Sequence, residues 1–297
     1  MPKRKILHML SPAANISPFD ANMAADAGYE IILPYTGVDS DGVTDLVQDA
    51  IFSRPPKNAG NTGVFIGGWD VNEAAEMFRK ARKAMVPPFE LSVFADPNGA
   101  YTTSAAMVAR VEHCLKQNDG QGLEGRKVKI FGGGPVGLCA AVLLAQQEAK
   151  PTLVRLTKSA NKDIVDHFAQ RYEVDITSAN GQTDELKKEA VQDADVIIAS
   201  AKAGICVASK AVLDAAPVLK VVADVNAVPP AGIEDVNAMD NGAELTANNG
   251  NVAAIGALVI GKIKYDVQQG LFKRMMESGE AQFIDFPQAY EFALQHV

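Results

Sequence analysis

The feature that most constrains this chain is an alternation of short apolar runs with longer amphipathic stretches, repeated in two blocks. Strands that take turns with helices form mostly parallel sheets with helices on both faces. The first block predicts strands at residues 5–10, 30–37, 62–68 and 91–96, separated by helices at 17–29, 40–54, 71–85 and 102–116. The second block predicts strands at 127–131, 152–156, 173–176, 195–200 and 220–225.

A polar, glycine-rich segment at residues 117–125 separates the two blocks and is typical of a linker. A chain of 297 residues is comfortable as two domains. We therefore predict a two-domain α/β fold with a cleft between the domains. An α/β substrate domain occupies residues 1–120, and a Rossmann-type doubly wound dinucleotide domain occupies residues 121–264. Residues 237–250 are predicted as a loop, and residues 251–278 are apolar enough to be largely buried.

Composition and charge exclude several classes of protein. Apolar residues make up 47% of the chain and charged residues 22%, as in globular proteins with an ample core. The net charge of −8 argues against nucleic acid as a partner. No run is long enough to cross a bilayer, and Cys114, Cys139 and Cys206 lie too far apart for a disulfide framework or a zinc knuckle. We expect a cytoplasmic protein with no membrane partner.

A glycine loop between an apolar strand and an apolar helix predicts the dinucleotide site. Gly132, Gly134 and Gly137 have the G-x-G-x-x-G spacing, and Pro135 and Val136 begin the helix. The first glycine allows a tight turn, the second lets the backbone approach a pyrophosphate, and the third lets the helix pack on the strand. The helix N-terminus adds free N–H groups and a partial positive charge.

The end of the second strand of this domain bears on the choice of nucleotide. An acid about 20 residues past the loop would bind the ribose of NAD, but residues 149–162 contain none. Arg155, Thr157, Lys158 and Ser159 occupy this stretch instead. Cations and hydroxyls favour the 2′-phosphate of NADP, with NAD as a second acceptor. The alternative is that Arg155 and Lys158 are only solvated cations at a sheet edge.

Ligands of parallel sheets bind beyond the carboxyl ends of the strands, and polar residues gather at these ends in both blocks. In the first block we expect substrate contacts from the loop that follows the fourth strand, at Asp96, Asn98, Gly99, Thr102 and Thr103. In the second block we expect further nucleotide contacts at Ala201, Lys202, Ala203 and Asn226. Taken singly, Asp96-Pro97-Asn98-Gly99 is also an ordinary turn, and the threonines are also ordinary helix caps.

The chain has few groups suited to acid–base catalysis. Its four histidines lie within predicted elements or at the terminus, and no metal-binding spacing occurs. A dehydrogenase without an acid–base pair suits a substrate that becomes a stable cation, such as one that loses hydride from an N–CH2–N bridge. Lys262 and Lys264 lie among apolar residues, where a lysine is either aimed at a ligand or extends its ammonium to solvent.

Several long segments resemble the bacterial NAD(P)-dependent methylenetetrahydromethanopterin dehydrogenases. They are SPFDANMAADAGYE, QDAIFSR, FIGG, FADPNGAYTTSAAMVA, IFGGGPVG, DVNAVPPAGI and IGALVIGKIKY, and the likeness runs from about residue 5 to about 295. The resemblance implies two α/β domains, a C-terminal helix from about 265 to 297 that returns to the first domain, and homo-oligomers, as trimers. It also implies hydride transfer from the methylene-pterin to NAD(P)+ without metal or flavin.

The resemblance also implies residue roles. The family's cleft lysine falls on Lys264, its aspartate after Phe falls on Asp20, and its D-x-N-G-x-x-T-T loop falls on the residues that follow Ala95. One position departs from the family. NADP-specific members carry an Arg-Lys pair where this chain has Thr157-Lys158, so the resemblance alone does not fix strict preference for NADP. A methylenetetrahydrofolate dehydrogenase and a non-catalytic NAD(P)H sensor remain the alternatives.

Overall fold

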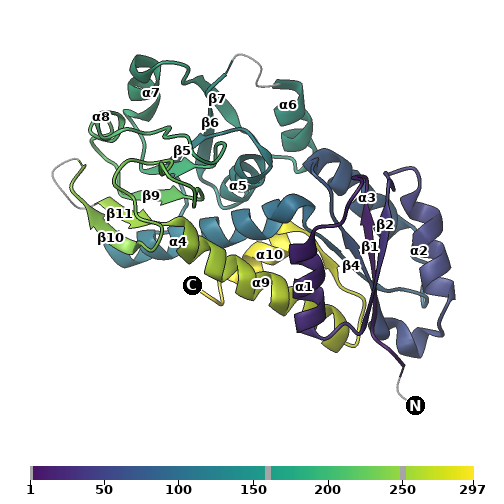
Figure 1. Ribbon diagram of the computed structural model, residues 1–297. Helices are drawn as coiled ribbons and strands as arrows, with labels where there is room; N and C mark the ends of the chain where they lie inside the picture. Colours follow the sequence, from purple (N-terminus) through teal and green to yellow (C-terminus); the bar gives the residue numbers. More distant parts are fainter. Residues whose placement is uncertain (1–2, 158–161, 248–251) are drawn as a thin grey trace. The chain divides into compact units, whose positions relative to one another are not determined.

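The computed structural model describes residues 3–157, 162–247 and 252–297, and these form two compact units (Figure 1). The first unit contains the chain up to Thr102 together with Tyr265–Phe292 and His296, and the second contains Thr103–Lys264 with Ala293–Gln295 and Val297. The chain passes from one unit to the other inside helices α4 (Ala100–Asp119) and α9 (Ala257–Glu277).

The first unit ends at Thr102, whereas the sequence predicts the boundary between the domains at residue 120. Residues 103–120 belong to the second unit by their contacts. One reason is visible in α4, where the Arg110 guanidinium donates from Nε to Asn241 Oδ1 at 2.7 Å. A polar linker marks where a helix ends, but the contacts of the helix decide which unit it joins.

The first unit is built on a five-stranded parallel sheet in the order β12-β4-β3-β1-β2. Its strands are β1 (Ile6–Ser11), β2 (Ile31–Thr36), β3 (Thr62–Ile66), β4 (Ser92–Ala95) and β12 (Phe283–Ile284). Its helices, besides parts of α4 and α9, are α1 (Pro18–Ala27), α2 (Val43–Phe52), α3 (Val71–Lys83), α10 (Phe286–Ala293) and the 3-10 turns η1 (Pro56–Asn61) and η2 (Pro97–Gly99). The four strands and four helices predicted in the first block are confirmed.

The core of the first unit joins residues from both ends of the chain. Phe65 in β3, Phe94 in β4 and Phe272 in α9 form a ring cluster with centroid separations of 5.2–5.5 Å. All three side chains are buried. Phe94 forms edge-to-face pairs with Phe65 and with Phe272, a geometry that adds to the free energy of burial. In Figure 1 the yellow-green end of α9 and the yellow α10 therefore belong to the same unit as the purple and blue strands.

The second unit is built on a seven-stranded sheet in the order β10-β11-β9-β8-β5-β6-β7. All neighbours are parallel except β10 and β11, which pair antiparallel. The strands are β5 (Lys127–Phe131), β6 (Lys150–Arg155), β7 (Thr177–Asn180), β8 (Val196–Ala199), β9 (Val221–Asp224), β10 (Asn241–Leu245) and β11 (Val252–Ile255). The helices are α5 (Pro135–Gln146), α6 (Lys162–Arg171), α7 (Asp184–Val191) and α8 (Lys210–Leu213). Counted from β5, the parallel strands have the Rossmann order 3-2-1-4-5-6.

Two details of the second block differ from the sequence-based prediction. The strand expected at 173–176 lies at Thr177–Asn180, because a turn with Glu173 at φ +55° follows helix α6. The predicted loop at 237–250 contains β10, and the apolar segment at 251–278 contains β11 and α9. β7 and β10 are the two edge strands of the sheet and are mostly exposed. Because edge strands carry polar residues, they lack the apolar runs from which buried strands are predicted.

Candidate active site

The glycine loop of the second unit lies where the strand order of its sheet reverses. The chain runs outward from β5 to β6 and β7 on one side, and to β8, β9 and β11 on the other. The loop after β5 therefore opens at the topological switch point, where dinucleotides bind in sheets of this kind. The loop after β8 meets it there, because Ser200 Oγ donates to the Gly132 carbonyl at 3.1 Å.

Each glycine of the loop occupies a different environment. Gly132 has φ +117°, and a Cβ on it would lie 2.7 Å from the Ala201 nitrogen. A Cβ on Gly137 would overlap the Gly132 carbonyl oxygen and lie 2.7 Å from Ser200 Oγ. A Cβ on Gly134 would meet nothing within 4 Å in the chain as described. Gly132 and Gly137 are thus required by the fold itself, whereas Gly134 keeps open a space in front of α5.

Helix α5 begins at this open space. Gly134 is its N-cap residue, Pro135 and Val136 form its first turn, and no side chain caps it within the described residues. Backbone N–H groups at a helix start, without a side chain in front of them, suit the pyrophosphate of a dinucleotide. The residues present therefore fit a bound dinucleotide.

The end of β6 carries the residues expected near the adenosine ribose. Arg155 is the last residue of the strand, and its buried Nε has no hydrogen-bond partner in the part of the chain that the structure describes. Thr157 follows and is exposed. Lys158 and Ser159 lie outside the described residues. A buried guanidinium nitrogen without a partner is costly, so a ligand that accepts its hydrogen bond would be favoured there.

The loops after β8 and β9 place the other predicted nucleotide contacts. Lys202 and Ala203 are exposed and Ala201 is half-buried, directly after the switch point. Asn226 differs, because its Nδ2 donates to the Pro230 carbonyl at 2.8 Å and its Oδ1 accepts from the Val228 N–H at 2.9 Å. Both polar atoms of the Asn226 side chain thus hold the loop after β9.

Asp224 anchors the same loop from the end of β9. Its buried carboxylate accepts from the N–H groups of Asn226, Gly232 and Ile233 at 2.8, 2.6 and 3.1 Å. Burial raises the pKa of Asp224 above its ordinary value, and the three backbone donors act in the opposite direction. This loop is therefore held in one conformation at the carboxyl edge of the sheet.

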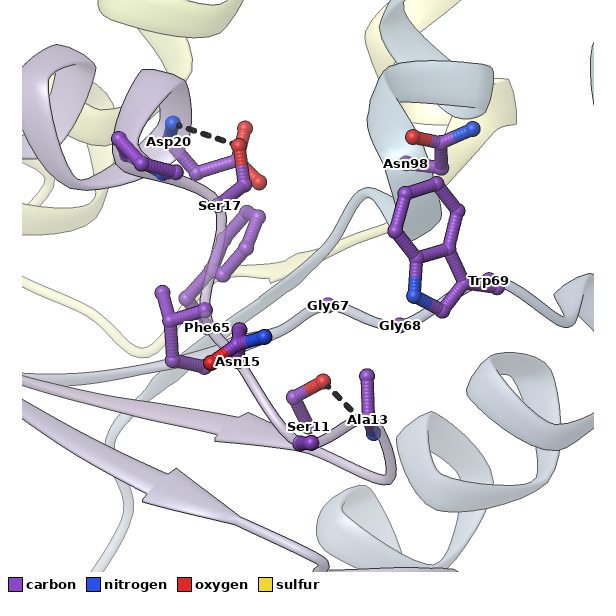
Figure 2. Close-up of a pocket in the computed structure, with 13 residues that line it drawn as sticks. Ser11, Ala13, Asn15, Ser17, Asp20, Phe65, Gly67, Gly68, Trp69 and Asn98 are labelled. Carbon is purple, nitrogen blue, oxygen red and sulfur yellow. Dashed lines mark hydrogen bonds between the residues drawn. The ribbon is translucent and has the colours of Figure 1, made fainter.

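The first unit has a pocket of its own at a second switch point. In its sheet β1 is followed outward by β2 on one side and by β3 on the other. A pocket of about 390 Å³ lies beyond the carboxyl ends of β1 and β3 (Figure 2). It is lined by Ser11, Ala13, Ala14, Asn15, Ile16, Ser17, Pro18, Asp20, Phe65, Gly67, Gly68, Trp69 and Asn98. Its size is that of a small-molecule site.

Asp20 reaches this pocket from the start of α1. Ser17 caps the helix by accepting from the Asp20 N–H at 3.4 Å, and proline follows in the first turn. Only 4% of the Asp20 surface is exposed, and its Oδ1 accepts from Gln268 Nε2 at 2.7 Å. A buried carboxylate that lines a pocket and has a fixed hydrogen-bond partner can stabilise positive charge on a ligand.

Gln268 holds the pocket residue Asp20 through a hydrogen bond, a role that was not predicted from the sequence. It is fully buried in α9, among the apolar residues Val267 and Leu271. A polar residue on the buried face of a helix was the available signal, but its partner Asp20 lies 248 residues away in the chain. Lys264 lies one helical turn before Gln268, on the same face. It is half-buried, whereas Lys262 is exposed.

The predicted loop after β4 divides into two parts. Asp96 and Thr102 are fully buried, and Thr102 Oγ1 donates to Asp96 Oδ2 at 2.6 Å. Asp96 Oδ1 also accepts from the Tyr101 and Thr102 N–H groups, so this carboxylate caps α4. Asn98 is exposed, has φ 51° and lines the pocket, and Gly99 beside it is buried with φ 65°. Thr103 is half-buried. Of the five residues predicted here, Asn98 is the one in the pocket lining.

Neither a metal centre nor a membrane-spanning helix is found among the described residues. No group of three or more His, Cys, Asp or Glu side chains is arranged to hold a metal ion in residues 3–157, 162–247 and 252–297. Over the same ranges, no helix combines the length and apolar character needed to cross a membrane.

A Rossmann-ordered sheet with a glycine loop at its switch point, preceded in the chain by a smaller parallel α/β unit, defines a two-unit α/β fold of the Rossmann type. The shikimate 5-dehydrogenase of Listeria monocytogenes, solved with shikimate and NAD, has this fold: the TM-score is 0.55, with 12% identity over 97% of this chain and 96% of the other. Residues 18–98 match the family model described as methylene-tetrahydromethanopterin dehydrogenase, N-terminal. The chain belongs to the NAD(P)-dependent methylenetetrahydromethanopterin dehydrogenase family.

That membership rests on full-length similarity. The chain is 44% identical to the NAD(P)-dependent methylenetetrahydromethanopterin dehydrogenase of Methylorubrum extorquens, over 98% of both chains. It is 31% identical to the bifunctional protein MdtA of the same organism, also over 98% of both chains. The family resemblance inferred from the sequence segments is thereby confirmed, as is the expected Rossmann-type α/β fold.

Proposed function

We propose that this protein oxidises methylenetetrahydromethanopterin to methenyltetrahydromethanopterin and reduces NAD(P)+, in a reversible reaction of one-carbon metabolism. The observation that carries the proposal is the 44% identity to a dehydrogenase of that name over 98% of both chains. The open glycine loop and the pocket with a buried carboxylate support it, because a hydride transfer needs one site for a nucleotide and one for a reduced pterin.

The chemistry of the substrate sets the roles that we assign to the residues. The methylene carbon loses a hydrogen with its bonding electron pair, and the two neighbouring nitrogens share the positive charge that remains. The bound nicotinamide supplies the carbon that accepts the hydride. Asp20 then stabilises the cation through its buried carboxylate, which Gln268 holds in place. No proton has to leave the carbon, so Lys264 binds and orients the pterin rather than acting as a base.

The substrate contacts of this proposal come mainly from the pocket of the first unit. Asn98 contacts the pterin directly, whereas Asp96 and Thr102 hold the loop that presents it. We assign Gly99 to the same loop and Thr103 to the first turn of α4 that follows it. We assign the glycine loop and Ala201, Lys202 and Ala203 to the nucleotide, with Asn226 shaping the loop beside it.

We also propose that NADP is preferred over NAD. Residues 149–162 contain no acid that would repel a 2′-phosphate, and Arg155 Nε has no partner among the described residues. Thr157 and Ser159 can donate hydrogen bonds, and Lys158 adds a cation. Arg155→Ala and Lys158→Ala should each raise KM for NADP several-fold and leave KM for NAD nearly unchanged. A wild-type kcat/KM that favours NAD would contradict this preference.

The decisive test combines two pterins with two nucleotides. Purified protein is assayed with methylenetetrahydromethanopterin and with methylenetetrahydrofolate, each with NAD+ and NADP+, by following the absorbance of the reduced nicotinamide. Turnover with the first pterin is expected, and better turnover with the folate would favour a methylenetetrahydrofolate dehydrogenase. Nucleotide binding without turnover of either pterin would favour an NAD(P)H sensor.

The remaining proposals concern cofactors and assembly. We propose a cytoplasmic homotrimer that needs neither metal nor flavin. Activity should survive dialysis against a chelator, and the purified protein should show no flavin absorbance. Light scattering after gel filtration should give three times the chain mass of 31.5 kDa.

A further inference from the structure

Trp69 is the only tryptophan of the chain, and 67% of its surface is exposed. Large aromatic side chains usually bury most of their surface, because exposing an indole forfeits much of its hydrophobic free energy. Trp69 also lines the pocket of the first unit. An exposed aromatic ring at the wall of a pocket suits a ligand that covers it on binding.

The backbone on both sides of Trp69 is fixed. Gly68 has φ +109°, and a Cβ on it would lie 2.9 Å from Pro12 Cδ, so the turn after β3 packs closely against the loop after β1. Asp70 follows Trp69 and caps helix α3, accepting from two backbone N–H groups at 2.8 and 3.2 Å. The exposure of the indole is therefore set by ordered structure rather than by a loose loop.

Figure 2 shows where the indole lies among the residues that line the pocket. It stands below Asn98 at one side, with the glycines 67 and 68 forming the stretch of backbone toward β3, while Asn15 and Asp20 lie at the other side. A flat ring can lie against the indole over the backbone of Gly67 and Gly68, which carries no side chains. The two amides and the carboxylate can then accept hydrogen bonds from N–H groups at the rim of that ring.

We propose that Trp69 is a substrate-binding residue that stacks on the pterin ring of the substrate. This inference rests on the proposed function and adds a residue and a mode of contact to it. A reduced pterin keeps one planar, nitrogen-rich ring, the pyrimidinone, whose N–H donors match the acceptors around the indole and whose flat face matches the indole face. The stacking fixes the plane of the ring, while Asn98 and Asp20 fix its rotation within that plane.

The single tryptophan makes the proposal directly measurable. Its fluorescence is titrated with tetrahydromethanopterin in the absence of nucleotide, and saturable quenching is expected. Trp69→Leu should raise KM for the methylene-pterin by about tenfold and leave KM for NADP unchanged, since stacking and its buried area are lost. Trp69→Phe, which keeps a flat ring, should recover most of that loss.

A matched control is available in the same unit. Phe52 ends α2, is 56% exposed and does not line the pocket, so Phe52→Leu makes a similar change elsewhere. It should leave both KM values unchanged. Equal melting temperatures of the wild type and the three variants would show that the fold is intact.

The outcomes separate this inference from the proposed function. Turnover by the wild type with no quenching, or with KM unaffected in Trp69→Leu, would overturn the role of Trp69 and leave the activity standing. Quenching by the pterin without turnover would support stacking and contradict the activity. A changed oligomeric mass in Trp69→Leu with unchanged KM would assign the indole to a subunit contact and refute stacking.

Discussion

Replacing glycine by alanine should have different effects at two positions of the nucleotide loop, because the added Cβ has different surroundings at each. At Gly134 an added Cβ would meet no described atom within 4 Å, and the residue has φ −78°, which any amino acid adopts. At Gly137 the Cβ would overlap the Gly132 carbonyl oxygen. We therefore expect Gly134→Ala to weaken nucleotide binding without destabilising the fold, and Gly137→Ala to destabilise the fold.

The magnitude at Gly137 follows from what the Cβ meets. The obstacle is backbone, so no rotamer change can relieve it, and α5 must move away from β5. Overpacking of this kind costs about 1–3 kcal/mol. The movement would also break the hydrogen bond from Ser200 Oγ to the Gly132 carbonyl. A bond of this kind contributes about 1 kcal/mol. A total of about 2–4 kcal/mol corresponds to a melting temperature lowered by roughly 5–15 °C.

The magnitude at Gly134 has a different origin. Replacing glycine at an unstrained position stabilises a protein by about 0.4–1 kcal/mol, because the unfolded chain loses freedom. In the bound state, however, the methyl group would occupy the space that we assign to the pyrophosphate. The dissociation constant of NADP should rise by roughly tenfold or more, which is about 1.4 kcal/mol.

The assay measures both quantities for each variant. Thermal unfolding is followed without nucleotide, and NADP affinity is measured by calorimetry well below the melting temperature. Gly261→Ala serves as the stability control, because its Cβ also meets nothing within 4 Å among the described residues and it lies within α9. Wild-type NADP affinity in Gly134→Ala would refute the assignment of that space to the phosphates. Equal destabilisation by both loop variants would refute the packing argument.

Three further predictions concern the first unit and α9. Lys264→Ala should lower kcat/KM for the pterin by a factor on the order of 10² without changing NADP affinity, and loss of one limb of the pH profile would instead make Lys264 a base. Gln268→Leu should lower kcat more than it raises KM for the nucleotide, because Asp20 loses its buried donor. Gln268→Glu also removes the amide donor, so wild-type kcat in either variant would count against a specific donor role. Burial raises the pKa of Asp285 to about 7, with Arg82 acting in the opposite direction. The unfolded chain then binds fewer protons, so stability falls as pH rises from about 4 to 7. Asp285→Asn should raise the melting temperature above pH 7 and leave it unchanged below about pH 4.

The sequence predicted those parts of the fold in which local pattern and tertiary role agree. The buried strand β8 is a continuous apolar run, β5 is apolar apart from Lys127 and Lys129, and the glycine spacing identifies the switch point between them. The edge strands β7 and β10 escaped prediction because they are exposed and polar. Their pairing is decided by neighbours in the sheet rather than by their own composition.

The candidate site was predicted less completely, for a related reason. Asp96 and Thr102 have the spacing of a ligand-binding loop and equally that of a helix cap, and only their full burial shows that they bond to each other. Gln268 becomes a site residue only through Asp20, which is remote in the chain. Trp69 follows a glycine pair at a strand end, but whether its ring is buried or exposed cannot be judged from neighbours in sequence.

The first unit combines the earliest and the latest parts of the chain to be synthesised, and this affects the order in which the two units can fold on the ribosome. All strands of the second sheet have been synthesised once β11 is made. The first sheet is complete only after β12 is made, and its ring cluster is complete only after Phe272 is made. The unit that is made first is therefore the one that is finished last, and its exposed apolar strands must persist through most of translation. Nascent chains stalled soon after Ile255 should yield a protease-resistant second unit and a digestible first one. Protection of residues 6–95 in those chains would show that the early strands fold without their late partners.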